Sequence, residues 1–115
     1  MEKEHNSMAS TIEFVTYVCA QIRGTEEITY KKMFGEYTIY CNDKIIGLIC
    51  ENQLFIKQTE SGKKLLSEVI EGSPYTGAKA HFLLESLEDR EELAKFIRAT
   101  YEELLEPKPK KKKLK

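Results

Sequence analysis

The sequence offers few side chains that could do acid–base chemistry. Its two histidines are His5, near the N-terminus, and His81, two residues after Lys79. A catalytic base needs a partner within hydrogen-bond reach and a pocket, and the residues around His81 indicate neither. We therefore interpret His81 as a surface histidine. We expect no catalytic residue in this chain and no enzymatic activity.

The cysteines do not form a metal-binding or redox pattern. Cys19, Cys41 and Cys50 contain no C-x-x-C pair and leave one thiol over under any pairing. Together with the two histidines they lack the spacing of a zinc site, and no glycine-rich phosphate-binding motif is present. We expect free thiols in a reducing cytoplasm, and neither a metal ion nor a cofactor.

The hydrophobic runs indicate neither a membrane protein nor a secreted one. The longest run, IIGLIC, is far below the ~18 apolar residues that a membrane-spanning helix needs. The first residues lack the basic and apolar regions of a signal peptide. We therefore predict a cytoplasmic protein that does not contact a membrane.

Charge is concentrated at the C-terminus. Residues 106–115 hold six lysines and one glutamate, a balance of +5, whereas residues 1–105 carry −6. The lysines are Lys108, Lys110, Lys111, Lys112, Lys113 and Lys115. This composition favours a disordered, solubilising tail. Two alternatives stay open: an electrostatic arm that binds nucleic acid, and a nuclear-import signal if the source is eukaryotic.

The remaining composition is that of one folded domain. The chain has 115 residues, of which 41% are hydrophobic and 32% charged, so it is long enough for one core and too short for two domains. We predict a flexible N-terminus over residues 1–9, a domain over residues 10–105 and the tail over residues 106–115.

Periodicity predicts an α+β fold. A capping box of Ser10 and Glu13 is expected to begin a first helix that ends at Gly24. Three strands should follow over residues 33–41, 44–50 and 53–57, joined by tight turns at Asn42-Asp43 and Glu51-Asn52. We further expect a helix over residues 61–70, a strand over residues 78–85 and a helix capped by Ser86. The prediction is an antiparallel meander with a further strand and about three helices.

The register of the first hairpin follows from its two-residue turn. It places Tyr40 opposite Ile45, Ile39 opposite Ile46, Tyr37 opposite Leu48 and Gly35 opposite Cys50. One face then carries Tyr37, Ile39, Ile46, Leu48 and Phe55, and the other carries Tyr40, Ile45, Ile49, Leu54 and Ile56. Because both faces are apolar, both need cover. We expect part of that cover to come from another subunit, in a homodimer.

Gly35 is unusual because glycine weakens a strand, and KKMFGEYTIY is otherwise rich in strand formers. We expect it to lie at a bulge or where another backbone approaches closely. A structural task of this kind is favoured over contact with a ligand.

The order of these segments resembles the N-terminal domain of the TfoX/Sxy family, in a stand-alone version that lacks the C-terminal domain. The motif that carries the resemblance is Met33, Phe34 and Gly35, followed by the aromatic strand that contains Tyr37. A lysine-ended strand at Lys57 and a strand leading into an acidic-capped helix complete it. The resemblance implies a fold similar to that of the type III secretion chaperones, often dimeric.

Taken together, these observations predict a non-catalytic interaction module that acts through contacts with an unidentified protein partner. The resemblance implies a regulator of transcription or competence. The alternative is a nucleic-acid-associated protein whose lysine tail supplies the affinity.

Overall fold

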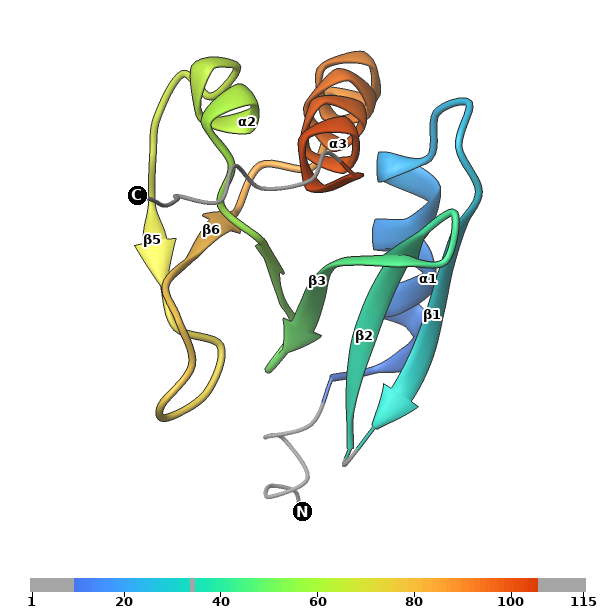
Figure 1. Cartoon of the computed structure of the whole chain (residues 1–115). Coiled ribbons are helices and arrows are strands. Elements are labelled where there is room, and N and C mark those ends of the chain that lie inside the picture. The colour runs from blue at the N-terminus through green and yellow to red at the C-terminus, as the bar shows by residue number, and fades with distance from the viewer. Residues whose placement is uncertain (1–9, 34, 106–115) are drawn as a thin grey trace.

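The computed structural model describes residues 10–33 and 35–105, and its α+β architecture confirms the predicted fold class. Six strands form one antiparallel sheet in the order β1-β2-β3-β4-β6-β5 (Figure 1). The elements are α1 (Ile12–Ile22), β1 (Ile28–Met33), β2 (Glu36–Cys41), β3 (Lys44–Cys50), β4 (Gln53–Ile56), α2 (Glu60–Lys64), β5 (Glu71–Gly72), β6 (His81–Leu84) and α3 (Arg90–Leu105).

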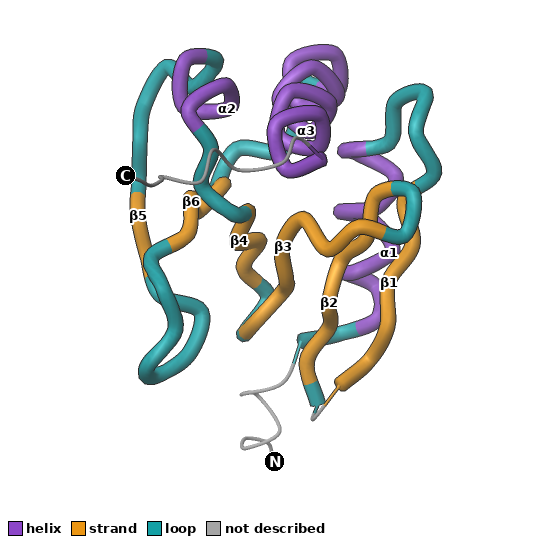
Figure 2. Tube along the Cα trace, viewed as in Figure 1, coloured by secondary structure: helices purple, strands orange, loops and turns teal. Residues whose placement is uncertain are grey.

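The helices cover one face of the sheet, which we call the inner face. In Figure 2, α1 lies behind β1 and β2, and α3 lies between α1 and α2. The buried stripe of α1 is Val15, Val18, Cys19 and Ile22, and that of α3 is Leu93, Phe96, Ile97 and Thr100. Except for the polar Thr100, these side chains share one core with Tyr37, Ile39, Ile49, Leu54, Ile56 and Phe82 of the sheet. The helical spacing of the apolar residues therefore predicts the correct buried faces.

Both predicted tight turns are confirmed. Asn42 and Asp43 have φ angles of 47° and 70°, and Glu51 and Asn52 have φ angles of 52° and 55°. Two successive residues with positive φ are typical of the hairpin turns whose twist matches that of the flanking strands. The backbone of Cys41 pairs with that of Lys44, and Cys50 pairs with Gln53.

The predicted register is correct for Tyr40 and Ile45 and wrong for the pairs beyond them, because β3 contains a bulge. Tyr40 pairs with Ile45 as expected, but Ile39 pairs with Gly47 and Tyr37 with Ile49. Ile46 is thus an extra residue on β3. A one-residue shift moves every later side chain to the opposite face of a sheet.

The bulge redistributes the apolar side chains between the two faces. Leu48 and Phe55, which we predicted beside Ile39, lie instead on the face away from the helices, with Tyr40 and Ile45. We call this second face the outer face; its strand residues include Lys31, Thr38, Tyr40, Ile45, Leu48, Phe55 and Leu83. Ile49, Leu54 and Ile56 are fully buried on the inner face. The prediction that both faces are apolar holds, although several of their residues are exchanged.

Gly35 occupies a turn and not a bulge. Met33 pairs with Glu36, so the predicted strand over residues 33–41 is in fact the end of one strand, a short connection and a second strand. Gly35 has φ of 83°, and a Cβ atom built on it would meet no atom within 4 Å. Its structural task is therefore a backbone conformation that favours glycine, and the predicted close approach is wrong.

Replacing Gly35 by valine should destabilise the protein. A β-branched side chain strongly disfavours positive φ, so we expect Gly35→Val to lower the free energy of unfolding by roughly 1–3 kcal/mol. Gly35→Asn should cost less, because asparagine tolerates this conformation. Thr38→Val, within β2, should be tolerated. Urea titrations at equal protein concentration measure these differences, and an unchanged midpoint for Gly35→Val would contradict the assignment.

The first helix is capped by Thr11, and the predicted capping box of Ser10 and Glu13 is wrong. The Thr11 side chain accepts a hydrogen bond from the backbone N–H of Phe14 at 3.2 Å. Ser10 is engaged elsewhere, since its hydroxyl donates to Glu36 Oε1 at 2.6 Å. The Ser10 side chain, which the local pattern predicts to cap the helix, therefore forms a tertiary hydrogen bond instead.

The second helix is also shorter than predicted. It spans Glu60–Lys64 and not residues 61–70, and the following segment forms β5. The N–H of Leu83 donates to the carbonyl of Ile70 at 2.8 Å, and Glu71 pairs with Phe82. Pairing with β6 thus draws this segment into the sheet edge.

The strand and helix that follow are shorter at their N-terminal ends than predicted. The predicted strand over residues 78–85 is confirmed only at His81–Leu84. Helix α3 begins at Arg90, where the Asp89 carboxylate accepts from the N–H of Glu92 at 3.1 Å, so the prediction of Ser86 as the cap is wrong.

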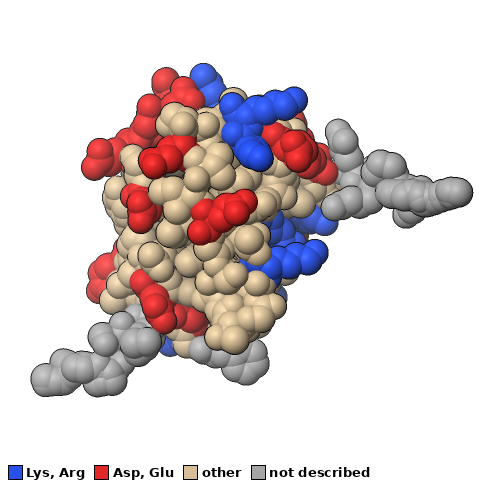
Figure 3. Space-filling view, turned by 90° about the vertical axis from the view of Figure 1, so that its left-hand side faces the viewer, with Lys and Arg blue, Asp and Glu red and all other residues tan. Residues whose placement is uncertain are grey.

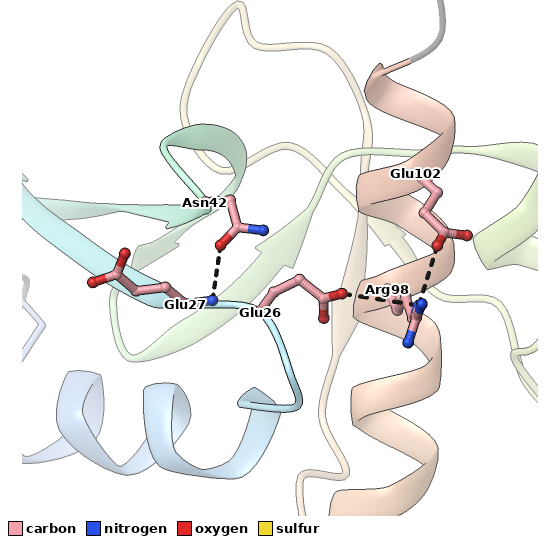
Figure 4. Close-up of polar contacts among 5 residues, drawn as sticks. All are labelled: Glu26, Glu27, Asn42, Arg98 and Glu102. Atoms are coloured by element: carbon pink, nitrogen blue, oxygen red, sulfur yellow. Dashed lines mark hydrogen bonds and ion pairs between the residues drawn. The ribbon is translucent and has the colours of Figure 1, made fainter.

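Polar contacts connect the α1–β1 loop with helix α3 and with the β2–β3 turn (Figure 4). Arg98 Nε of α3 lies 3.8 Å from Glu26 Oε2 and 3.1 Å from Glu102 Oε2. Next along the chain, Glu27 N–H donates to Asn42 Oδ1 at 2.9 Å, and Asn42 N–H donates to the Glu27 carbonyl at 2.8 Å. The β2–β3 turn and α3 therefore both hold the start of β1.

Candidate interaction surface on the outer face of the sheet

The outer face contains a groove of about 740 Å³. Its apolar lining includes Met33, Ile45, Leu48, Tyr75 and Ala78. Met33, Ile45 and Tyr75 are 48%, 39% and 62% exposed, values that are high for large apolar side chains. A concave apolar surface of this size lies within the range of ligand-binding clefts. The helices do not cover it, because they pack on the inner face.

One wall of the groove is the loop over residues 73–80, which joins β5 to β6 and projects at the lower left of Figure 2. The loop is held by its own hydrogen bonds. The N–H of Ala78 donates to the Tyr75 carbonyl at 3.0 Å, and Ser73 Oγ donates to the Ala78 carbonyl at 3.2 Å. Gly77 has φ of 90°. These contacts shape the wall before any partner arrives.

The charged residues that line the groove are mostly basic. Lys57, Lys79 and His81 lie along it, and Glu36 is the one acidic residue among its described lining residues. On the β1 side of the outer face, Lys31 Nζ lies 5.7 Å from the centroid of the Tyr40 ring, a cation–π contact. Residues 10–105 as a whole carry 11 basic and 16 acidic side chains. The groove is therefore a locally basic surface on an acidic domain.

The charged side chains are also unevenly distributed when the molecule is viewed from the β5 side. In Figure 3, acidic side chains lie over the left and centre of the molecule and also at its upper right, and basic side chains lie at its top and right. Clusters of opposite sign on one small domain give different parts of its surface different potentials.

Glu36 is occupied by structural hydrogen bonds. Its Oε1 accepts from the backbone N–H of Ser10 at 3.2 Å and from the Ser10 hydroxyl at 2.6 Å, and its Oε2 accepts from the N–H of Glu51 at 3.0 Å. In the same network, Asn52 N–H donates to Ser10 Oγ at 3.0 Å, and Thr11 N–H donates to Asn52 Oδ1 at 3.0 Å. This carboxylate joins the start of α1 to the β3–β4 turn.

Of the predicted motif residues, Met33 and Tyr37 both line the groove. Met33 is exposed at the end of β1, whereas Tyr37 is 7% exposed and its ring packs edge-on against Tyr30, with centroids 5.7 Å apart. Gly35 lies in the turn between them along the chain. Phe34 and the lysines of residues 106–115 lie outside the described residues.

Sequence reasoning missed Leu48, Tyr75 and Lys79 as members of a common surface. We predicted Leu48 on the opposite face, because no local sequence pattern indicates the bulge. Tyr75 and Lys79 belong to a loop whose glycine and proline content shows only that it is a loop. Their approach to the sheet is a tertiary property.

The three thiols are buried, as expected for structural cysteines. Burial, together with the smaller effect of the nearby Glu26 carboxylate, raises the pKa of Cys41 to about 11. Burial together with Glu36 and Glu51 raises the pKa of Cys50 to about 11, and burial raises that of Cys19 despite the opposing effect of Arg23. Because the thiolate is the reactive form, these thiols are poor nucleophiles at neutral pH.

We expect the native thiols to resist alkylation. Native protein treated with iodoacetamide at pH 8 should remain largely unmodified, because burial keeps the thiols both protonated and inaccessible. The same treatment in concentrated urea should add three carbamidomethyl groups, one on each cysteine. Intact-mass spectrometry measures the difference. Rapid modification of the folded protein would contradict this description.

His81 occupies a half-buried position at the start of β6. Its Nδ1 lies 2.8 Å from the carbonyl oxygen of Lys79 in the preceding loop, and because a carbonyl oxygen only accepts, Nδ1 is the donor of this hydrogen bond. Across the part of the chain that the structure describes, no group of three His, Cys, Asp or Glu side chains could hold a metal ion. Across those same residues, no helix is long and apolar enough to cross a membrane.

Comparison with known proteins identifies the family. The model of the TfoX N-terminal domain matches residues 20–104. An uncharacterised 12.7 kDa protein encoded in the trpE 5′ region of Spirochaeta aurantia is 30% identical over 109 residues, which cover 94% of this chain and 95% of that protein. No solved structure matches significantly, so the likeness to secretion chaperones stays a prediction. The match over most of the described residues shows that this chain belongs to the TfoX N-terminal domain family.

Proposed function

We propose that this chain is a non-catalytic interaction module that acts through protein contacts at the outer face of its sheet. The observation that carries the proposal is the exposure of Met33, Ile45 and Tyr75 around one apolar groove. Contiguous exposed apolar surface rimmed by polar residues is typical of interaction sites. The buried, protonated thiols favour a binding role over nucleophilic chemistry.

The family supports a regulatory role within this proposal. The TfoX name is attached to regulators of competence, and we propose that this chain also works in the cytoplasm as a regulatory module. Its contribution would be to bring partners together through the apolar groove on this face of the sheet.

We further propose that the chain is a homodimer. Two outer faces are poorly suited to each other, because their basic residues would meet. The edge strand β1 offers a self-complementary alternative. A two-fold antiparallel pairing centred on Tyr30 places Lys31 opposite Thr29 and Lys32 opposite Ile28, so no two lysines face each other directly. This arrangement leaves both grooves open.

Sedimentation equilibrium at micromolar concentration should therefore give twice the chain mass of 13.3 kDa. Tyr30→Lys should shift the protein to the monomer, because it places two lysines directly opposite each other. Tyr17→Lys is the matched control, since Tyr17 on α1 is 45% exposed and Tyr30 is 40% exposed. A wild-type protein of monomer mass only would remove the homodimer from the proposal.

The outer-face contact itself can be tested by capture from the source cells. Leu48→Asp places a carboxylate on the floor of the groove, and Tyr17→Asp places one on α1. We expect a protein retained by the wild type and by Tyr17→Asp to be lost with Leu48→Asp, with circular dichroism confirming that both variants fold. Equal retention by Leu48→Asp, or no retained protein at all, would count against this face as the interaction surface.

A further inference from the structure

Two properties of the outer-face groove restrict the chemical class of partner that it can bind. Its exposed lining surface is apolar for the most part, and Met33, Ile45, Leu48 and Ala78 contribute to it. Burial of such side chains against a partner contributes roughly 25 cal/mol per Å² of apolar area removed from water. A purely charged ligand would leave this surface uncovered.

The rim supplies the second property, a positive potential. Lys57 and Lys79 line the groove beside His81, and Lys31 lies farther along the same face. Among the described lining residues Glu36 is the one acidic residue, and its two carboxylate oxygens accept hydrogen bonds from Ser10 and from the N–H of Glu51. Two lysines and one carboxylate among these residues give the groove a positive potential for an approaching carboxylate.

We infer that the groove binds an acidic segment of a partner protein in which Asp or Glu alternates with large apolar side chains. The apolar side chains would enter the groove, and the carboxylates would face Lys57, Lys79 and Lys31. This inference rests on the proposed function and names the chemical class of the protein that the outer face contacts.

Two other occupants fit less well. Single-stranded nucleic acid needs aromatic platforms for its bases. Among the described aromatic residues at or beside the groove, Tyr75 is exposed, Tyr37 is 7% exposed and Tyr40 is half-buried beneath Lys31. A second copy in the groove would bring two basic rims together.

The loop over residues 73–80 is held by its own hydrogen bonds, so this wall of the groove is formed before a partner binds and need not be ordered by it.

The test uses the full chain and three fluorescent probes of similar length: a peptide of alternating Asp and Leu, a peptide of alternating Lys and Leu, and an oligo-thymidine single strand. Fluorescence polarisation should rise saturably with the acidic peptide alone, and its affinity should fall as salt is added. Lys79→Glu should weaken this affinity about tenfold, because a repulsive charge replaces an attractive one. Lys95→Glu on α3 should leave it unchanged.

Stronger binding of either the basic peptide or the oligonucleotide would overturn the inference, and so would equal effects of Lys79→Glu and Lys95→Glu. Absence of binding by all three probes would also overturn it. These failures are distinct from failure of the proposed function. If the wild type still captures a protein that Leu48→Asp does not, the outer face remains the contact surface and only the acidic class of its partner is wrong.

Discussion

Gly47→Ala should be the most destabilising single-methyl addition in the sheet. Gly47 lies on β3 next to the bulge and pairs with Ile39 on one side and Ile56 on the other. A Cβ atom at this position would lie 2.2 Å from the carbonyl oxygen of Phe55 and 3.0 Å from the Cα of Ile56. Both are backbone atoms of β4, so the two strands must separate. We expect a loss of about 3 kcal/mol or more in the free energy of unfolding.

Gly72→Ala is the matched control, because a Cβ atom on Gly72 would meet nothing within 4 Å. That variant should unfold within about 0.5 kcal/mol of the wild type. Urea titrations followed by circular dichroism give both values. A Gly47→Ala protein as stable as Gly72→Ala would mean that β3 and β4 are farther apart than described, and the register around the bulge would then be wrong.

Glu36→Ala should have the second large effect. The substitution removes the acceptor for three hydrogen bonds, two from Ser10 and one from the N–H of Glu51. Ser10 is 8% exposed, so water replaces the lost partner poorly. Glu51 also has positive φ, a conformation that its hydrogen bond to Glu36 helps to hold. We expect a cost of about 2–3 kcal/mol, typical of charge-assisted hydrogen bonds at a partly buried site.

Glu68→Ala, in the exposed α2–β5 connection, is a suitable comparison because it also removes one carboxylate. It should change the stability by less than about 0.5 kcal/mol. Glu36→Gln should fall between the two, since it keeps an acceptor oxygen for Ser10. If Glu36→Ala proves as mild as Glu68→Ala, the network from α1 to the β3–β4 turn does not hold the N-terminal helix.

Local chemistry was enough to predict the turns and the buried faces of the long helices. Asn42, Asp43 and Asn52 adopt positive φ angles, which asparagine and aspartate tolerate, and Glu51 shares its turn with Asn52. The apolar spacing of α1 and α3 predicted which side chains are buried. In both cases the determining residues lie close together in sequence, so the signal is contained in a short window.

The errors arose where distant residues decide the structure. Ser10 caps nothing because Glu36, 26 positions away, takes its hydroxyl. The segment after α2 joins the sheet because β6 offers it hydrogen-bond partners. Gly35 was placed inside a strand because Phe34-Gly35 lacks the asparagine or aspartate of the commonest hairpin turns.

The candidate site depended on the one feature that no local pattern indicated. Ile46 and Gly47 lie in an apolar run that predicts a regular strand. In the structure, Ile46 is an additional residue of β3 that has no counterpart on β2. Without that bulge, Leu48 would face the helices and the groove would lose its floor. The sequence therefore predicted an apolar sheet with an uncovered face but assigned some of its residues to the wrong side.

The most direct test of the outer face as the interaction surface is site-specific photocross-linking in the source cells. A benzophenone amino acid would replace Ile45 on the outer face in one variant and Tyr17 on α1 in another; these residues are 39% and 45% exposed. We predict that irradiation of the Ile45 variant gives a discrete adduct with another protein and that the Tyr17 variant gives none. Adducts of equal yield at both positions, or an adduct at Tyr17 alone, would contradict an interaction surface on the outer face.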